Sequence, residues 1–178
     1  MPSELEIKIL ESLRDVPDFP KKGIVFKDIT PLLKNPELLN LTIKALAAEV
    51  LKTEANIIIG LEARGFIFGS LLAQELKLPF VPIRKLGKLP WKTKKIEYAL
   101  EYGTASIELH EDALSKGDKV IIIDDLLATG GTCEAACKLI ESFEAKVVLC
   151  AFVIELAFLK GRSLLEKHSK VISLSKVK

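Results

Sequence analysis

The sequence lacks a long hydrophobic run, a cysteine framework and an excess of charge of one sign. Its longest apolar stretches, such as Val147–Ile154, are far shorter than the roughly 20 residues of a membrane helix, and acids interrupt residues 1–14, which argues against a signal peptide. Three cysteines without a CxxC motif argue against disulfides and a cysteine-rich zinc site, so we expect a cytoplasmic protein. A net charge of +2 argues against a general nucleic-acid binder.

What the sequence does contain fits one globular domain over residues 1–178. Apolar residues make up 49% of the chain and charged residues 28%, a balance typical of a folded protein. A chain of this length buries roughly 70% of its unfolded surface and builds a core without covalent staples. There is no internal repeat, so the fold must be inferred from hydrophobic patterning.

The N-terminal part is predicted to contain two helices. Ser3 and Glu6 form a capping box that starts a short helix, and Pro36 suits the first turn of a second one. Three prolines and one glycine between these helices predict that residues 15–31 are mostly irregular.

From residue 56 onward, short apolar runs rich in β-branched residues alternate with helical segments. The runs predict strands buried on both faces, at residues 56–60, 80–84, 120–123 and 147–154. Helices are predicted at residues 66–76 and 133–143. Strands separated by helices predict an α/β fold, with a mostly parallel twisted sheet flanked by helices.

This alternation breaks between Lys85 and Gly117. Residues 84–95 contain six basic residues and no acid, and segments 98–102 and 105–110 predict a hairpin that turns near Gly103. A basic loop and a hairpin inserted into an α/β core are typical of a lid over a site. We call residues 86–104 the hood.

The strongest functional signal is the segment from Val120 to Thr132. A buried strand ends in Asp124 and Asp125, at the end of a parallel strand where ligands bind, and the turn Ala-Thr-Gly-Gly-Thr at residues 128–132 leads into a helix. Glycines let the backbone approach a ligand, and N–H groups at a helix start bind anions together with the threonine hydroxyls. The segment is neither a Walker A motif nor a dinucleotide fingerprint. We therefore predict a phosphate in this turn, the phosphate loop, and a diol or metal-linked group on the aspartates.

The same segment resembles the phosphoribosyl pyrophosphate loop of type I phosphoribosyltransferases. Matches to residues 18–31, 60–66, 84–90 and 100–103 extend the resemblance over nearly the whole chain. It implies the type I phosphoribosyltransferase fold with an inserted hood. The form DDLLATGGT is similar to that of the adenine-specific members, which implies transfer of the 5-phosphoribosyl group from phosphoribosyl pyrophosphate to adenine, giving AMP and pyrophosphate.

The resemblance also implies a cofactor, a partner and an assembly. Mg²⁺ accompanies the donor and is held mainly by pyrophosphate, so no dedicated protein metal site is expected. The substrates are small molecules, with no nucleic acid or membrane partner. The family is usually dimeric, and we expect a homodimer.

Site residues follow from the same resemblance. Asp124 and Asp125 address the ribose hydroxyls and favour the cationic sugar of an oxocarbenium-like transition state. The 5′-phosphate is bound by Ala128, Thr129, Gly130, Gly131 and Thr132. The pyrophosphate residues are Glu62, Ala63, Arg64, Arg84, Lys85 and Lys88, with a non-proline cis peptide expected at Glu62-Ala63.

The purine and its proton require a further set of residues. The resemblance assigns Glu101 to the proton near purine N7 and Tyr102 to closure of the hood. The adenine residues are Val25, Phe26, Lys27 and Leu156, with Phe26 offering a ring for stacking.

Other interpretations of these residues remain open. Phe26 also suits ordinary core, Arg64 a surface ion pair and Glu101 an exposed hairpin acid. At the level of function, the alternatives are a 6-oxopurine or xanthine phosphoribosyltransferase and a non-catalytic regulator that binds phosphoribosyl pyrophosphate on the same fold.

Overall fold

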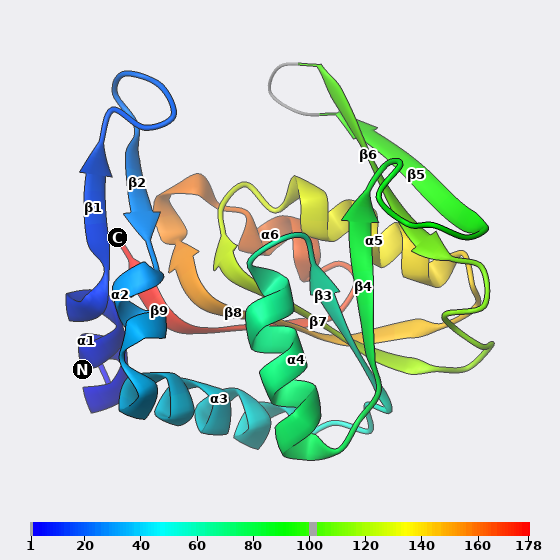
Figure 1. Ribbon diagram of the computed structural model, residues 1–178, viewed down its shortest axis with the longest axis horizontal. Coiled ribbons are helices and arrows are strands. Elements are labelled where there is room, and N and C mark those ends of the chain that lie inside the picture. The colour runs from blue at the N-terminus through cyan, green and yellow to red at the C-terminus, as the bar shows by residue number, and fades with distance from the viewer. Residues whose placement is uncertain (1, 100–102) are drawn as a thin grey trace.

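A seven-stranded sheet forms the centre of the computed structural model, which describes residues 2–99 and 103–178 (Figure 1). The strand order is β5-β6-β4-β3-β7-β8-β9. The five strands from β4 to β9 in this order pair in parallel, whereas β6 pairs antiparallel with both β4 and β5. The predicted α/β fold with a mostly parallel sheet is confirmed. The bounds of the seven strands are β3 Ile57–Leu61, β4 Phe80–Lys85, β5 Thr93–Ala99, β6 Thr104–His110, β7 Lys119–Leu127, β8 Lys146–Leu156 and β9 Lys170–Val177.

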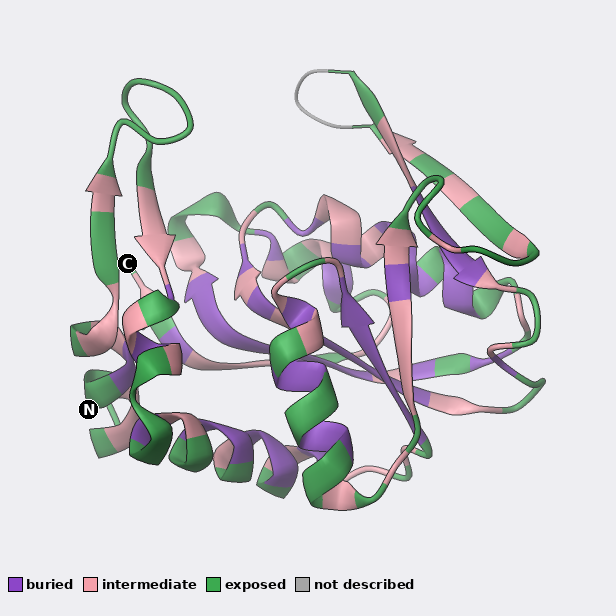
Figure 2. Cartoon of the chain, viewed as in Figure 1, coloured by how far each residue is buried: buried purple, intermediate pink, exposed green. Residues whose placement is uncertain are grey.

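Helices cover both faces of the sheet and bury it completely at its centre. Residues of β3 alternate between the two hydrophobic cores, with Ile58 packing on one side and Ile57 and Ile59 on the other. Burial on both faces explains why this strand is apolar throughout (Figure 2). One core contains α1 Glu4–Ser12, α2 Thr30–Lys34, α3 Pro36–Val50 and α4 Gly65–Leu76, and the other contains α5 Gly131–Glu141 and α6 Arg162–Leu165.

The predictions for the N-terminal part are confirmed for its helices and wrong for the segment between them. The Ser3 hydroxyl accepts a hydrogen bond from the Glu6 N–H at the start of α1, and Pro36 begins α3. Residues 15–31, expected to be irregular, instead contain most of an antiparallel hairpin of β1 Arg14–Pro17 and β2 Val25–Asp28, followed by the start of α2. Each hairpin strand is only four residues long, and the prolines of this segment masked the pattern.

The predicted hairpin is present and begins within the hood, but its first strand starts earlier than expected. Residues 93–95, assigned to the basic loop, are the start of β5, which pairs with β6 along its whole length. The basic loop is therefore confined to residues 86–92. The edge strand β9 was not predicted. Among the described residues, no helix is long and apolar enough to span a membrane.

Candidate active site

The carboxyl ends of β3 and β7 lie side by side and bring two predicted segments together. The two strands pair in parallel up to Gly60 opposite Ile123. Gly65, which starts α4, lies so close to β7 that a Cβ atom there would be 2.6 Å from the Ile123 carbonyl oxygen and 3.0 Å from Asp124 Oδ1. The loop of residues 62–64 and the aspartate pair therefore share one site.

Asp125 of the aspartate pair is buried, with only 2% of its surface exposed, and Asp124 beside it is partly buried. Arg64 Nη1 lies 3.0 Å from Asp125 Oδ2, and the Asp125 N–H donates to Asp124 Oδ1. Burial, together with the neighbouring charge of Asp125, raises the pKa of Asp124 well above its usual range. Burial also raises the pKa of Asp125, although the Arg64 guanidinium opposes this shift. Such a pair is suited to stabilising a positive charge that approaches it.

The phosphate loop lines a small hollow of about 100 Å³ together with Leu61, Asp124 and Phe152. Gly130 has a φ of +86°, a left-handed conformation that favours glycine, and is the N-cap of α5. Gly131 has open space where a Cβ atom would lie. The five predicted residues of this loop are thus brought together at a helix start, an arrangement that binds anions.

Gly161 packs directly against the phosphate loop, a contact that the sequence patterns do not predict. A Cβ atom at Gly161 would lie 2.2 Å from the Ala128 carbonyl oxygen and 2.8 Å from the Gly130 nitrogen. Two backbone segments that are more than 30 residues apart in sequence therefore touch directly. The only signal in the sequence is a single glycine before a short helix, which does not show what it contacts.

Glu155 holds this supporting segment in place. It is 5% exposed, and both of its carboxylate oxygens accept hydrogen bonds from Arg162, at 3.0 and 2.5 Å. Ser173 Oγ also donates to it. Glu155 is therefore a structural residue, and it fixes the residue that follows Gly161. Leu156, a predicted adenine residue, ends β8 at the same edge of the sheet.

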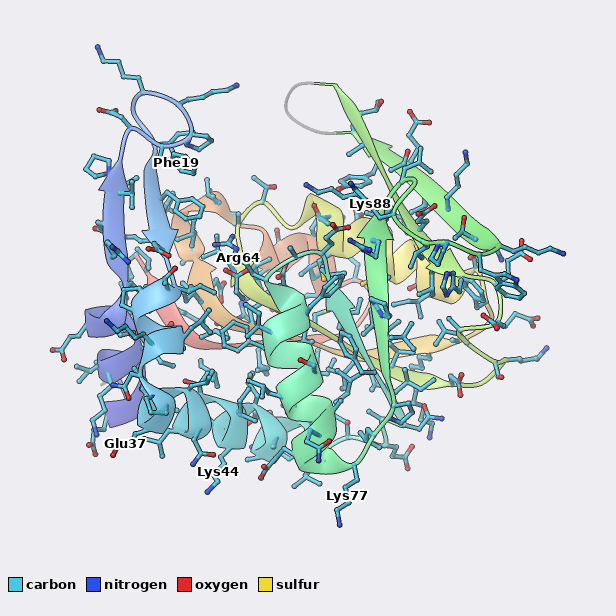
Figure 3. All side chains as sticks on the ribbon, viewed as in Figure 1. Phe19, Glu37, Lys44, Arg64, Lys77 and Lys88 are labelled. Carbon is cyan, nitrogen blue, oxygen red and sulfur yellow. The ribbon has the colours of Figure 1, made fainter. Side chains whose placement is uncertain are left out.

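Phe26 faces the site and is not part of either hydrophobic core. The Arg64 guanidinium carbon lies 5.1 Å from the centroid of the Phe26 ring, and the Phe19 and Phe26 rings form a T-shaped pair with their centroids 5.2 Å apart. Figure 3 shows Arg64 between the β1–β2 loop, where Phe19 is labelled, and the loop that carries Lys88. Arg64 therefore contacts both Phe26, the ring predicted to stack on a purine, and Asp125 of the aspartate pair.

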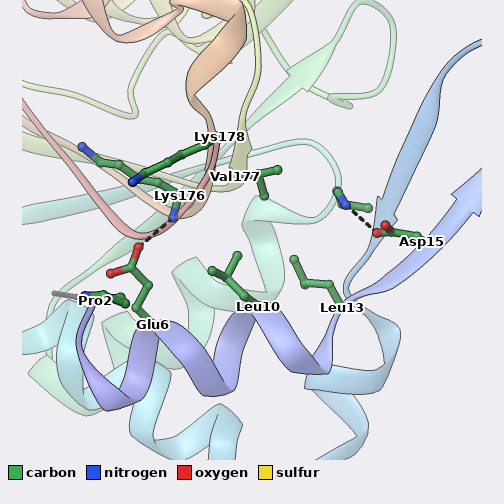
Figure 4. A pocket seen from close by; sticks show the side chains of 9 residues that line it. Pro2, Glu6, Leu10, Leu13, Asp15, Lys176, Val177 and Lys178 are labelled. Atoms are coloured by element: carbon green, nitrogen blue, oxygen red, sulfur yellow. Dashed lines mark hydrogen bonds and ion pairs between the residues drawn. The ribbon is translucent and has the colours of Figure 1, made fainter.

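The Lys27 side chain points away from Phe26, as expected for neighbouring residues of a strand. Its ammonium pairs with Asp15 at 2.5 Å in a groove between α1 and the end of β9 (Figure 4). Lys27 can therefore offer a purine its backbone groups, whereas its ammonium is engaged elsewhere. Val25, at the start of β2, is half exposed.

The predicted pyrophosphate residues lie on two adjacent loops. The Glu62-Ala63 peptide is cis, as the resemblance led us to expect. The Glu62 carboxylate accepts hydrogen bonds from Arg84 Nη2 and from the Lys85 N–H, so it joins the two loops. Burial opposes the ionisation of Glu62, but these two donors lower its pKa below the ordinary value.

Glu101 and Tyr102 lie outside the described residues. The strand that leads to them is linked to the phosphate loop, because the hydroxyls of Tyr98 and Thr132 lie 3.1 Å apart. The hood and the phosphate loop are therefore in contact.

The site thus combines a glycine turn at the start of a helix, an aspartate pair with one buried member, and a ring beside a guanidinium. Residues 29–178 match the family model of the phosphoribosyl transferase domain. The chain belongs to the phosphoribosyltransferase family. Its sequence resemblance to type I phosphoribosyltransferases is confirmed, and Arg64 connects the predicted donor segments at the carboxyl ends of β3 and β7 with Phe26 of the first hairpin.

Named relatives of this phosphoribosyltransferase share most of its length. It is 52% identical over 162 residues to adenine phosphoribosyltransferase of Nitrosococcus oceani, which covers 91% of this chain and 95% of that protein. A crystal structure of adenine phosphoribosyltransferase from Thermoanaerobacter pseudethanolicus has a TM-score of 0.93 at 50% identity, covering 96% and 99% of the two chains. The enzyme from Saccharomyces cerevisiae, complexed with an imino-altritol bisphosphate and adenine, has a TM-score of 0.90 at 41% identity, covering 96% and 98%.

The three cysteines of this phosphoribosyltransferase are buried core residues without disulfides. Cys150 Sγ lies 3.7 Å from Cys133 Sγ and 3.8 Å from Cys137 Sγ. Among the described residues, they are the group whose ligand atoms lie close enough together to hold an ion. Thiolates suit soft metals, whereas Mg²⁺ requires oxygen ligands, so the chemistry of this cluster does not suit Mg²⁺.

Proposed function

We propose that this protein transfers the 5-phosphoribosyl group from phosphoribosyl pyrophosphate to adenine, giving AMP and pyrophosphate. The observation that carries the proposal is the contact of Arg64 with both Asp125 and the Phe26 ring. A ribose on the aspartates and a purine at Phe26 would therefore meet at Arg64. The adenine phosphoribosyltransferases that share half of the sequence support the same reaction.

The site residues divide the work of the reaction among them. The phosphate loop holds the 5′-phosphate, and Asp124 and Asp125 stabilise the positive charge that develops on the ribose as pyrophosphate leaves. Arg64, Arg84, Lys85 and Lys88 supply cations for the leaving group. Glu101 manages the proton at purine N7, and Tyr102 closes over the ribose. Leu156 and Phe26 provide apolar walls for the base.

Adenine is favoured over a 6-oxopurine by the environment of Lys27. An oxopurine needs a hydrogen-bond donor at O6, and the Lys27 ammonium is paired with Asp15 on the opposite side of the hairpin. Backbone carbonyls of Val25 and Lys27 can instead accept from the 6-amino group of adenine.

The test is AMP formation from phosphoribosyl pyrophosphate and Mg²⁺, with adenine, hypoxanthine, guanine and xanthine offered in parallel. We expect product from adenine alone. Product from an oxopurine would keep the reaction type and contradict the proposed base site. Binding of the donor without product from any base would favour a non-catalytic regulator.

We further propose that Mg²⁺ enters with the donor, whose phosphate oxygens supply most of its ligands. The aspartate pair suits this arrangement, because Asp125 is already paired with Arg64 and does not form a cluster of free carboxylates. EDTA is expected to abolish AMP formation while leaving the melting temperature of the free protein unchanged. A lower melting temperature in EDTA, restored by Mg²⁺, would contradict this.

We also propose a homodimer in the cytoplasm. Three free, buried cysteines suit a reducing compartment. The exposed basic loop of residues 86–92 is suited to reaching a neighbouring subunit. Light scattering after size-exclusion chromatography tests the dimer, and a monomeric mass would contradict it.

A further inference from the structure

Glu108 is a buried carboxylate beneath the basic loop, and the reaction described above gives it no role. It lies in β6 opposite Arg84 of β4, and only 3% of its surface is exposed. A buried carboxylate must be compensated by a cation or by hydrogen bonds. Within the described part of the chain, Glu108 forms no ion pair, so its compensation comes from hydrogen bonds.

These hydrogen bonds come mainly from the backbone of the basic loop. Glu108 Oε1 accepts from the N–H groups of Lys88 and Leu89, both at 3.0 Å, and Oε2 accepts from the Thr93 hydroxyl at 3.2 Å. Burial opposes its ionisation, but the N–H groups of Leu89 and Lys88 outweigh burial and lower the pKa of Glu108. The carboxylate thus stays charged and the loop is folded around it.

A second carboxylate holds the other end of the same loop. Glu62 Oε2 accepts from the Lys85 N–H at 2.8 Å, and Arg84 bridges from Glu62 to the Lys88 carbonyl oxygen. The backbone of residues 85–89 is therefore fixed at both ends. The side chains of Lys85 and Lys88 remain exposed, and neither forms an ion pair within the residues that the structure describes.

We propose that Glu108 is a positioning residue for the pyrophosphate: it holds the backbone of Lys88 and Leu89 so that the Lys88 ammonium group is presented to the leaving group. This inference rests on the proposed function. Cations fixed before the reaction stabilise developing charge better than cations that must be ordered during it. The N–H and O–H donors of the loop compensate the Glu108 carboxylate locally, because its oxygens are directed at them.

Three substitutions separate positioning from charge. Glu108→Gln keeps an oxygen for the two N–H groups, and its amide can donate to the Thr93 hydroxyl. Glu108→Asp keeps the charge, but its side chain is one methylene too short to reach the loop. Glu108→Ala removes both the charge and the hydrogen bonds. We expect Gln to bind Mg²⁺-pyrophosphate within about twofold of the native protein and Ala and Asp to bind about tenfold more weakly. Glu97→Gln, an exposed acid on the neighbouring strand, is the control.

Affinity is measured by calorimetry with Mg²⁺ and pyrophosphate in the absence of a base. The KM for phosphoribosyl pyrophosphate should rise in parallel with it, with the KM for adenine unchanged. Weak binding by Gln with normal binding by Asp would show that the charge matters and would overturn the inference, as would native affinity in all three variants.

Hydrogen exchange provides a readout that does not require activity. The Lys88 and Leu89 amides should exchange faster in Glu108→Ala and Glu108→Asp, and at the native rate in Glu108→Gln. If Glu108→Ala does not fold, the comparison of Asp with Gln decides the outcome. A native protein that binds pyrophosphate but forms no AMP would contradict the proposed function alone. An active native protein whose Asp variant keeps native amide exchange and pyrophosphate affinity would contradict this inference alone.

Discussion

Asp124 and Asp125 are the residues at which stability and activity are in conflict. Burial raises the pKa of both carboxyls, so their ionised forms cost folding free energy at neutral pH. Asp124→Asn removes one of the two neighbouring charges and keeps an acceptor for the Asp125 N–H. We expect the free energy of unfolding to rise by about 1 kcal/mol and AMP formation to fall at least about tenfold.

Urea denaturation at neutral pH and steady-state rates measure the two effects. Asp112→Asn, at an exposed position, is the matched control and should change neither. A less stable Asp124→Asn protein with native turnover would contradict the assignment of this pair.

Phe26 and Lys27 are neighbours whose side chains point to opposite sides of the hairpin. Phe26→Ala should raise the KM for adenine about tenfold, because a ring that stacks on a base contributes on the order of 1–3 kcal/mol. Lys27→Ala should raise it far less, because the backbone remains and only the pair with Asp15 is lost. Ile24→Ala, exposed on the same hairpin, serves as the control. Equal effects of Phe26→Ala and Lys27→Ala would contradict the stacking role.

At the scale of elements, the segment before α6 determines the shape of the phosphate loop. Gly161→Ala places a methyl group against the Ala128 carbonyl oxygen, so the loop must move. Overpacking of this kind costs about 1–3 kcal/mol, and we expect the KM for phosphoribosyl pyrophosphate to rise at least about tenfold while the KM for adenine stays the same. Ser163→Ala, exposed in the same segment, is the control. Native donor affinity in Gly161→Ala would show that the contact does not shape the loop.

The Glu155–Arg162 pair joins β8, α6 and β9, and it makes stability depend on pH. Burial opposes ionisation of Glu155, but Arg162 and Ser173 outweigh it and lower its pKa. Its contribution is therefore complete above the unfolded pKa of about 4.3 and is lost as pH falls through the lower native value. Glu155→Gln should reduce the free energy of unfolding by about 2 kcal/mol at neutral pH, with the difference shrinking below about pH 4. Denaturation curves across this range check it, and a difference that does not change with pH would contradict it.

The elements that could be predicted from the sequence are those buried on both faces. Ile57–Leu61 and the run at residues 120–123 are apolar throughout, and their shortness and β-branched residues favour a strand over a buried helix. β9 escaped prediction because Ser173 and Ser175 interrupt its apolar residues. The first hairpin escaped because its pairing depends on tertiary packing that four-residue strands do not encode.

For the site, the sequence was informative where chemistry requires a motif and uninformative where geometry alone matters. The phosphate loop and the aspartate pair are continuous segments whose residue types can be recognised in the sequence. The contact of Gly161 with Ala128 and the hold of Glu108 on the basic loop arise between segments distant in sequence. A single glycine or a glutamate in a strand has many ordinary structural roles. Only the structure therefore shows what Gly161 and Glu108 contact.

Across the whole molecule, the two groups of strands have different environments. The parallel strands form the covered centre, and β1–β2 and β5–β6 stand on opposite sides of the carboxyl ends of β3 and β4 (Figure 1). The phosphate loop and the aspartate pair follow β7 of the covered centre, whereas Phe26 lies in the first hairpin and Lys88 in the basic loop before β5. The predicted base and pyrophosphate residues therefore belong partly to elements outside the covered centre.

β5 lies at the edge of the sheet, and residues 93–95 of the basic run belong to this strand. An edge strand presents unpaired backbone groups on which a foreign chain can extend the sheet. β5 carries Lys94, Lys95 and Glu97 at exposed positions, and Lys94 is fastened to the end of α5 through the Ser142 carbonyl oxygen. Charges on an edge oppose the addition of another strand. Lys94, Lys95 and Glu97 thus make β5 a poor template for a further strand.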